Sequence, residues 1–294
     1  MKKIISIILF NLLLIVIFLG IFEFCLYQNH HKNQPEINYK IKEVKYNDIL
    51  NYYRLRPAVG VENSKRPIIL AGCSYAYGQG LNDEQTFGYK LSHYTKRPVY
   101  NFSLPGKGIQ HNLFFLQNKM YDETIKNPEY FIYIMMKDHI RRLYTTVCLH
   151  DYTGYPEYKL NSENKLILNK DKYPFYKQFY VYYFFNNLLF NYVGSNNHTK
   201  HTILIKEYFR EIKKTIKEEY PNIKFVILFY GDYDKYFNLQ LDELQQEGFI
   251  FIHAQDLINK NLFDIENHLS ENDFHPSEKL WDTFTPEFAK KLDL

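Results

Sequence analysis

Short apolar segments bounded by turn residues recur along the chain and predict the strands of a buried sheet. The segment 222–230, for example, contains FVILFY and is followed by Gly231. A continuous apolar run, without the polar alternation of a half-exposed strand, is typical of a parallel sheet covered on both faces. The predicted strands lie in residues 65–74, 97–104, 129–137, 222–230 and 249–254.

Segments with helical periodicity separate these predicted strands. In residues 201–220, apolar side chains recur at steps of three and four, and charged residues occupy the opposite positions. Residues 83–96 have a similar pattern, with Asp83 placed to cap the helix, and residues 108–125 form another such segment. Strands that alternate with helices predict a parallel sheet between two layers of helices.

An apolar segment near the start of the sequence predicts a membrane anchor. Residues 4–22 follow two lysines and are interrupted only by Ser6 and Asn11. At about 1.5 Å per residue, a helix of this length reaches about 28 Å, close to the thickness of the bilayer's hydrocarbon core. A cleaved signal peptide is the alternative, but the segment is longer than a usual h-region and no A-x-A-like site follows it. We therefore expect residues 1–27 to form an uncleaved transmembrane anchor.

The rest of the chain divides into a linker and one domain. Residues 28–63 are polar and rich in Asn, Lys and Tyr, which predicts a stalk that becomes an arm on the domain. The domain is predicted to span residues 64–294, with an aromatic-rich insertion at about 151–200. Within it, residues 172–193 form either a helix that packs across the sheet edge, or an aromatic lid or membrane-facing surface near the substrate.

Composition and charge narrow the classes of function. The chain has 294 residues, with Lys+Arg 36 against Asp+Glu 33 and a net charge of +3. It lacks the basic excess that neutralises phosphates, so we expect no nucleic-acid partner. The three cysteines, Cys25, Cys73 and Cys148, have no metal-ligand spacing and allow at most one disulfide, between the last two. We expect no metal site.

Ser74 lies directly after the first predicted strand, in the sequence GCSYAYG (72–78). Open α/β sheets place their ligands at the carboxyl ends of their strands. If a helix begins just there, the hydroxyl and the backbone N–H of Ser74 both face the site, which supplies a nucleophile and an oxyanion donor together. Serine is also a common helix N-cap, so this motif alone leaves a structural role open.

Two further motifs follow strand ends. PGKG (105–108) comes after the second predicted strand, and its Gly106 permits close approach of the backbone to a ligand, although Pro-Gly occurs in ordinary turns as well. In NDFHPS (272–277), Asp273 stands two residues before His275, which suits a general base oriented by a carboxylate. A lone loop histidine is a weak signal, because the chain has 11 histidines.

In their order along the chain, these motifs resemble the blocks of the SGNH (GDSL-type) hydrolases, over about residues 64–290. GCSYAYG resembles the first block, with Cys73 where the family has Asp; PGKG resembles the second, and DFHP the last. The resemblance implies a flavodoxin-like three-layer α/β/α fold with a mostly parallel sheet of about five strands, in a membrane-anchored bacterial-type member. It also implies Ser74 as nucleophile, His275 as base and the N–H groups of Ser74 and Gly106 in an oxyanion hole, with no metal or organic cofactor.

Two positions depart from the family pattern. Lys137 stands where the third block has an Asn that adds an oxyanion donor; its ammonium either takes that place as a flexible point charge or points outward. The usual acid position, three residues before the histidine, is Asn272. Because only a carboxylate stabilises the imidazolium, we expect Asp273 to complete the triad. A polar cluster, open to ligand contact or to salt bridges, follows Lys137: Asp138, His139, Arg141 and Arg142.

The resemblance implies an esterase or acyltransferase that acts on O-acyl esters, with water or a sugar hydroxyl as acceptor. Family members in the cell envelope often act on acylated polysaccharide. We therefore expect that substrate class, and a periplasmic or extracellular domain held on the inner (plasma) membrane by residues 4–22. Cys73 and Lys137 favour one alternative, a weak or inactive protein that binds a glycan or a partner. A lipid esterase or thioesterase, served by residues 172–193, is the other.

Overall fold

The computed structural model describes residues 11, 14–25, 56, 58–63, 65–119, 125–144, 158–168, 198–231, 241–258 and 261–294. The chain separates into two compact units, and one of them, Lys42–Leu143 with Pro156–Asn169 and His198–Leu294, holds all three predicted motifs. In the other unit, residues 14–25 are helical. No helix within the ranges above is long and apolar enough to cross a membrane. The predicted anchor, residues 4–22, lies only partly within those ranges.

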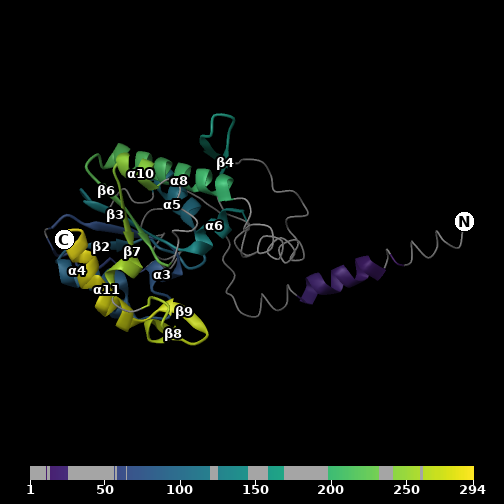
Figure 1. Ribbon diagram of the computed structural model, residues 1–294, viewed down its shortest axis with the longest axis horizontal. Helices are drawn as coiled ribbons and strands as arrows, with labels where there is room; N and C mark the ends of the chain where they lie inside the picture. The colour runs from purple at the N-terminus through teal and green to yellow at the C-terminus, as the bar shows by residue number, and fades with distance from the viewer. Residues whose placement is uncertain are drawn as a thin grey trace, which may run out of the picture. The chain divides into compact units, whose positions relative to one another are not determined.

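A five-stranded parallel sheet forms the centre of the motif-bearing unit (Figure 1). Its strand order is β2-β1-β3-β6-β7. Its strands are β1 (Ile68–Ala71), β2 (Val99–Asn101), β3 (Tyr130–Met135), β6 (Lys224–Phe229) and β7 (Phe249–His253). Each strand lies within one of the apolar segments, so the strand predictions are confirmed. The order is that of flavodoxin-like folds, in which strands are added first on one side of β1 and then on the other.

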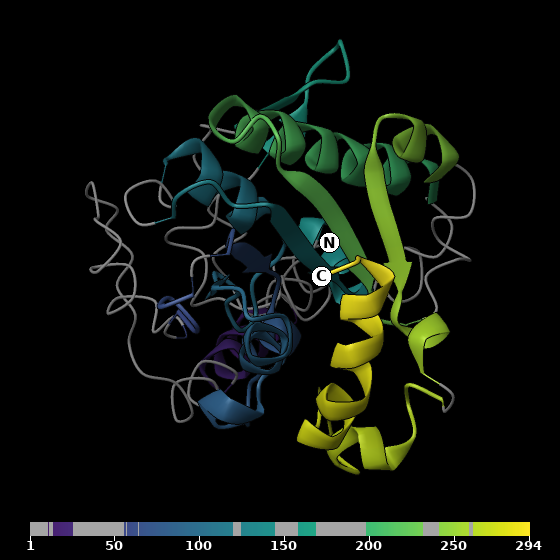
Figure 2. The ribbon, with the colours of Figure 1, turned by 90° about the vertical axis from the view of Figure 1, so that its left-hand side faces the viewer.

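Helices cover both faces of the sheet, as the alternation of segments predicts. α5 and α8 share one core with the sheet, and α4 and α11 share the other, so that α8 and α11 stand on opposite sides in Figure 2. These helices are α4 (Phe87–Thr95), α5 (Ile109–Gln117), α8 (His198–Glu219) and α11 (Glu278–Lys291).

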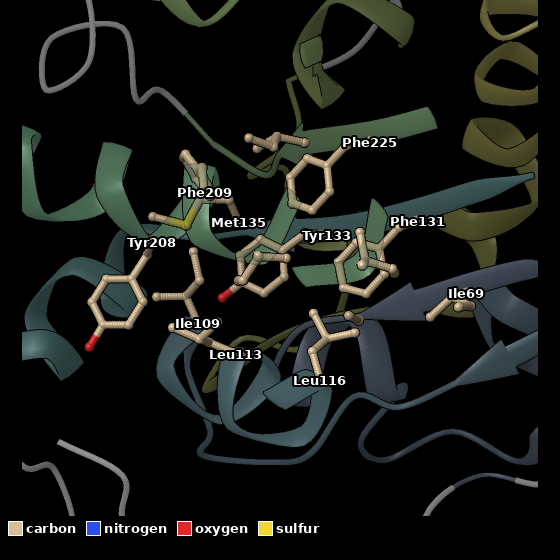
Figure 3. Packing of buried hydrophobic residues seen from close by; sticks show 14 of the residues in the cluster. Ile69, Ile109, Leu113, Leu116, Phe131, Tyr133, Met135, Tyr208, Phe209 and Phe225 are labelled. Carbon is tan, nitrogen blue, oxygen red and sulfur yellow. The ribbon is translucent and has the colours of Figure 1, made fainter. Parts of the chain in front are cut away.

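Side chains of β3 alternate between the two cores, as the pleat of a strand requires. Phe131 and Tyr133 pack on the side of α5 and α8, whereas Ile132 and Ile134 pack on the side of α4 and α11. Figure 3 shows the first of these cores, with Ile109 of α5 near Tyr133. All of these β3 side chains are fully buried, which explains the continuous apolar run in the sequence.

Two of the predicted helices begin or end at different residues from those expected. α4 begins after Thr86, whose Oγ1 accepts a hydrogen bond from the Tyr89 N–H at 3.3 Å, so Asp83 is not its cap. Asp83 instead starts a separate 3₁₀ turn, η1 (Asp83–Gln85). α5 ends at Gln117, well before residue 125. Periodicity locates the buried stripe of a helix, but the caps decide where the helix stops.

Several elements have no counterpart in the sequence prediction. α11 buries Trp281, Phe284 and Phe288 although Pro286 lies within it. A proline inside a helix usually breaks or kinks it, so Pro286 is a signal against a helix here. The others are α6 (Lys137–Tyr144), α10 (Leu241–Gln246), η5 (Ala254–Leu257), η6 (Ile265–Asn267), and the hairpins β4 (Tyr158–Leu160) with β5 (Leu166–Leu168) and β8 (His268–Ser270) with β9 (Asp273–Pro276). The aromatic stretch 172–193 lies outside the described residues.

Candidate active site

The first motif and Lys137 lie where the strand order reverses. α3 (Ser74–Tyr77) follows β1, whose chain continues through α4 to β2, whereas α6 follows β3, whose chain continues through α8 to β6. These two connections leave the sheet on opposite faces. The carboxyl ends of such a strand pair are the usual ligand position in open α/β sheets.

Ser74 is the first residue of α3 and is only 5% exposed. Within the described residues its N–H has no hydrogen-bond acceptor, as is usual for the first N–H of a helix, and its Oγ donates to Cys73 Sγ at 3.9 Å. Gly72 has a φ of +153°, and a Cβ there would lie 2.8 Å from Ala76 Cβ and 3.1 Å from Ile134 O. Gly72 therefore allows α3 to begin directly against the sheet.

Cys73, at the position where the family has Asp, is a free and fully buried thiol. Its Sγ donates to Met136 Sδ at 3.0 Å, which joins the end of β1 to the residue before Lys137. Cys148, the partner that the sequence left open for a disulfide, lies outside the described residues.

The second motif forms a tight turn beside the first. The Leu104 N–H donates to Gly72 O at 3.2 Å, and the Lys107 N–H donates to Leu104 O at 3.1 Å. Pro105 and Gly106 occupy the centre of this turn, and Gly106 has a φ of +74°, as the third residue of a type II turn requires. A Cβ on Gly106 would meet nothing within 4 Å, so the space beside this glycine is open.

A buried amide, which the sequence analysis did not identify, ties these two motifs together. Asn101, at the end of β2, is 5% exposed. Its Nδ2 donates to Ala76 O at 2.8 Å, and its Oδ1 accepts from the Ser103 N–H at 3.0 Å. Asn101 therefore fixes α3 relative to the segment that leads into the Gly106 turn.

The third motif forms β9, and it pairs His275 with Asp273. Oδ1 of Asp273 accepts from the His275 backbone N–H at 3.0 Å and lies 2.5 Å from Nδ1 of the ring. Two residues apart on a strand, these side chains share one face. Burial alone would raise the pKa of Asp273, but the hydrogen bonds from His275, together with the charges of His275 and His268, hold this pKa below its usual value. Asn272, the alternative acid position, is exposed.

Tyr75 links the His275–Asp273 pair to the segment that begins with Ser74. Its ring contacts the His275 ring, with centroids 5.1 Å apart, and meets Tyr230 edge-on at 5.0 Å. α3 and β9 are in contact (Figure 1). Burial, with the charges of Cys73, Asp138 and Asp273, raises the pKa of Tyr75 to about 12, so the phenol stays neutral. No hydrogen bond links Ser74 Oγ to the His275 ring in the described part of the chain; in ligand-free enzymes such bonds often tighten only when substrate binds.

Three residues of the polar cluster after β3 have described contacts: Asp138, His139 and Arg142. Arg142 Nη1 donates to Lys107 O at 2.8 Å, and its Nη2 lies 3.6 Å from Asp138 Oδ2, so salt bridging accounts for part of the cluster. His139 is fully buried, with Nδ1 2.7 Å from Tyr133 Oη, and burial and the charge of Arg142 lower its pKa well below the usual value. Across the residues that the structure covers, no group of His, Cys, Asp or Glu could hold a metal ion.

Lys137, the predicted third oxyanion donor, is the first residue of α6, and its side chain is exposed. Lys137→Ala is expected to lower kcat by less than the roughly 10²–10³-fold loss of a fixed oxyanion donor, because a lysine ammonium is a point charge on a flexible stem. Lys137→Asn should match or exceed the wild type, since an amide presents a more rigid donor. Steady-state kinetics on a short-chain aryl ester measures both. Equal kcat in all three proteins would place Lys137 outside the site.

Comparison with known proteins finds similarity among solved structures. No family model matches the chain, and no curated protein sequence matches it. Similar structures include the acetyl xylan esterase Est2A from Butyrivibrio proteoclasticus, with TM-score 0.45 and 12% identity over 78% of this chain and 64% of that one. A member of the lipolytic protein G-D-S-L family from Veillonella parvula has TM-score 0.42 and 11% identity over 78% of this chain and 98% of that one. A family two carbohydrate esterase from Cellvibrio japonicus has TM-score 0.42 and 12% identity over 78% of this chain and 61% of that one.

Proposed function

We propose that this chain is a serine esterase or acyltransferase that acts on O-acyl esters through Ser74, His275 and Asp273. One observation carries the proposal: His275 pairs with Asp273 while its ring packs on Tyr75, the residue after Ser74. Because Nδ1 of His275 faces the carboxylate, Nε2 is the nitrogen that accepts the serine proton. A hydroxyl at the start of α3 and an acid-base pair beside it are the groups that acyl transfer needs.

In the proposed reaction, Ser74 Oγ attacks the ester carbonyl while His275 takes its proton. The backbone N–H groups of Ser74 and Gly106, with the Lys137 ammonium, stabilise the oxyanion that forms. Collapse of the intermediate breaks the ester C–O bond, the alcohol leaves with the proton from His275, and Ser74 keeps the acyl group. Water, or a sugar hydroxyl in a transferase, then gives its proton to His275 and attacks the acyl carbon. The bond between the acyl carbon and Ser74 Oγ breaks, His275 returns the proton to Ser74 Oγ, and the acid or the new ester leaves.

The proposal includes a cellular setting and a substrate class. Residues 4–22 would hold the protein in the inner (plasma) membrane, with the domain in the periplasm or outside the cell and acylated polysaccharide as the substrate. The apolar run supports the anchor, and the resemblance to SGNH hydrolases of the cell envelope supports the substrate class.

A fluorophosphonate probe tests the catalytic proposal, because it reacts with activated serines. The full chain in isolated membranes should take the label, and peptide mapping should place the adduct on Ser74. The purified protein should also hydrolyse a short-chain aryl ester. Heat-denatured protein is the control and should take no label. If neither labelling nor hydrolysis occurs, the alternative of a non-catalytic glycan- or partner-binding protein replaces this proposal.

The labelled protein also tests the predicted anchor. It should remain with the membranes after carbonate extraction, and its amino terminus should lie at or near Met1. A mature amino terminus beyond Gly20 would show that residues 4–22 are a cleaved signal.

A further inference from the structure

The side chain of Arg56, in the predicted arm, lies against the turn that follows α3. Its Nε donates to Tyr77 O at 3.1 Å, and its Nη2 donates to Gly78 O and Leu81 O, each at 2.7 Å. Its Nη1 pairs with Asp83 Oδ1 at 2.5 Å, and the guanidinium lies 4.6 Å from the centroid of the Tyr77 ring. These contacts leave 16% of the side chain exposed.

α3 needs partners at its carboxyl end because it contains only four residues. The N–H groups of Tyr77 and Gly78 bond back to Cys73 O and Ser74 O, but the last carbonyls of a helix have no partner within it. Asn101 Nδ2 satisfies the first of them, at Ala76, and Arg56 Nε satisfies the next, at Tyr77. Gly78 O, just after the helix, accepts from Arg56 Nη2 and also from the Leu81 N–H at 3.1 Å. A cation at the carboxyl end of a helix also interacts favourably with the helix dipole.

The arm reaches α3 along the edge of the sheet. Val59 and Val99 exchange two backbone hydrogen bonds, of 3.0 and 2.9 Å, so the arm pairs with edge strand β2. Ser92 Oγ, from α4, donates to Val59 O at 3.2 Å. These contacts fix the backbone just after Arg56 and so bring its guanidinium to the turn.

We infer that Arg56 is a positioning residue that sets the orientation of α3, and with it the Oγ and N–H of Ser74. The inference rests on the proposed catalytic role of Ser74. Arg56 bonds to the turn rather than to Ser74, so it acts through α3. Without its donors, the Tyr77 carbonyl would turn toward water, Gly78 O would keep only the Leu81 N–H, and the short helix would shift. A misplacement of about 1 Å can cost about 10²-fold in rate. The described end of the arm, residue 56 with residues 58–63, is then part of the proposed catalytic unit.

Arg97 offers a matched control for the loss of a half-buried arginine. Its side chain is 14% exposed, against 16% for Arg56, and it pairs with Glu129 at 2.6 Å. It also lies near a ring, 5.9 Å from the centroid of Tyr130. Arg97 and Glu129 stand just before β2 and β3, so they lie at the amino ends of the strands, at the opposite edge of the sheet from Ser74.

The experiment compares the wild-type full chain with Arg56→Ala, Arg56→Lys and Arg97→Ala, measuring kcat and KM on a short-chain aryl ester and the melting temperature. Arg56→Ala is expected to lower kcat by about 10- to 100-fold with KM nearly unchanged, and methylguanidinium in the assay should restore part of the loss. The kcat of Arg56→Lys should lie between those of the wild type and Arg56→Ala, because lysine keeps the positive charge but replaces a planar fork of donors by a point charge. Arg97→Ala should lower the melting temperature to a similar extent, keep kcat near wild type and not respond to methylguanidinium.

Equal kcat in the wild type and Arg56→Ala would overturn the inference, and so would an equal loss of kcat in Arg97→Ala, since the effect would then be one of general stability. If Arg56→Ala does not fold, Arg56→Lys takes its place, and its kcat is compared with those of the wild type and Arg97→Ala in the same way. A wild-type protein that takes no fluorophosphonate label would refute the proposed function itself. An active, labelled wild type with fully active Arg56 variants would refute only the role of Arg56.

Discussion

Alanine in place of Ser74 is expected to lower kcat on a short-chain aryl ester by about 10⁶-fold, and alanine in place of His275 by nearly as much. The two side chains act as one unit. The hydroxyl is a weak nucleophile unless a base takes its proton, and the base has no role in the reaction without the hydroxyl. The double variant should therefore be no slower than either single variant, and steady-state kinetics of the three proteins measures this lack of additivity.

Ser103→Ala is the matched control for Ser74→Ala. Ser103 is also fully buried and follows β2 much as Ser74 follows β1, but its hydroxyl bonds to no residue that the structure describes. The substitution keeps the backbone N–H that bonds to Asn101, so kcat should stay close to the wild-type value. Circular dichroism should show the same fold for every variant. If Ser74→Ala kept the wild-type kcat, another residue would have to be the nucleophile.

The sheet, and the place of Ser74 on it, could be predicted because both depend on local pattern. β6 is apolar along most of its length because helices cover both of its faces. A residue that closely follows β1 must lie near the carboxyl edge of the sheet, whatever the rest of the chain does. These inferences need no knowledge of contacts between distant residues.

The contacts that hold the site depend on residues far apart in the sequence, which no local pattern encodes. Asn101 and Ala76 are 25 positions apart, and Arg56 and Tyr77 are 21 positions apart. In the sequence, Arg56 is one cation in a polar segment, and only the fold shows that its donors meet carbonyls after α3. Asn101 did leave a signal, since a polar side chain within the apolar segment 97–104 is costly to bury without hydrogen bonds.

The β8–β9 hairpin contains both candidates for the residue that orients His275, Asn272 and Asp273. Asn272 stands three residues before His275, as the usual acid of the family does, yet it lies exposed in the turn between the strands. Asp273 lies on β9, two residues before His275, so both side chains point to the same face. Strand geometry therefore supports the choice that the charge argument made from sequence.

Asp273→Asn is expected to lower kcat by about 10⁴-fold. The carboxylate accepts the His275 backbone N–H at 3.0 Å and lies 2.5 Å from Nδ1, so it holds the ring with the Nδ1 proton toward itself and Nε2 ready to accept a proton. An amide of the same shape can turn its NH₂ toward Nδ1, which favours the tautomer that carries the proton on Nε2. The substitution also removes the charge that stabilises the imidazolium once His275 has taken the serine proton.

Asn272→Ala is the matched control, and its kcat should remain near wild type because the side chain it removes is exposed. The measurement is kcat on one ester for the three proteins as a function of pH. Because His275 holds the pKa of Asp273 below its usual value despite burial, the carboxylate stays charged throughout about pH 5–8. The pH profile of the wild-type rate should accordingly contain no step from Asp273 in that range. A larger loss in Asn272→Ala than in Asp273→Asn would assign the orienting role to the amide and leave Ser74 and His275 as a dyad.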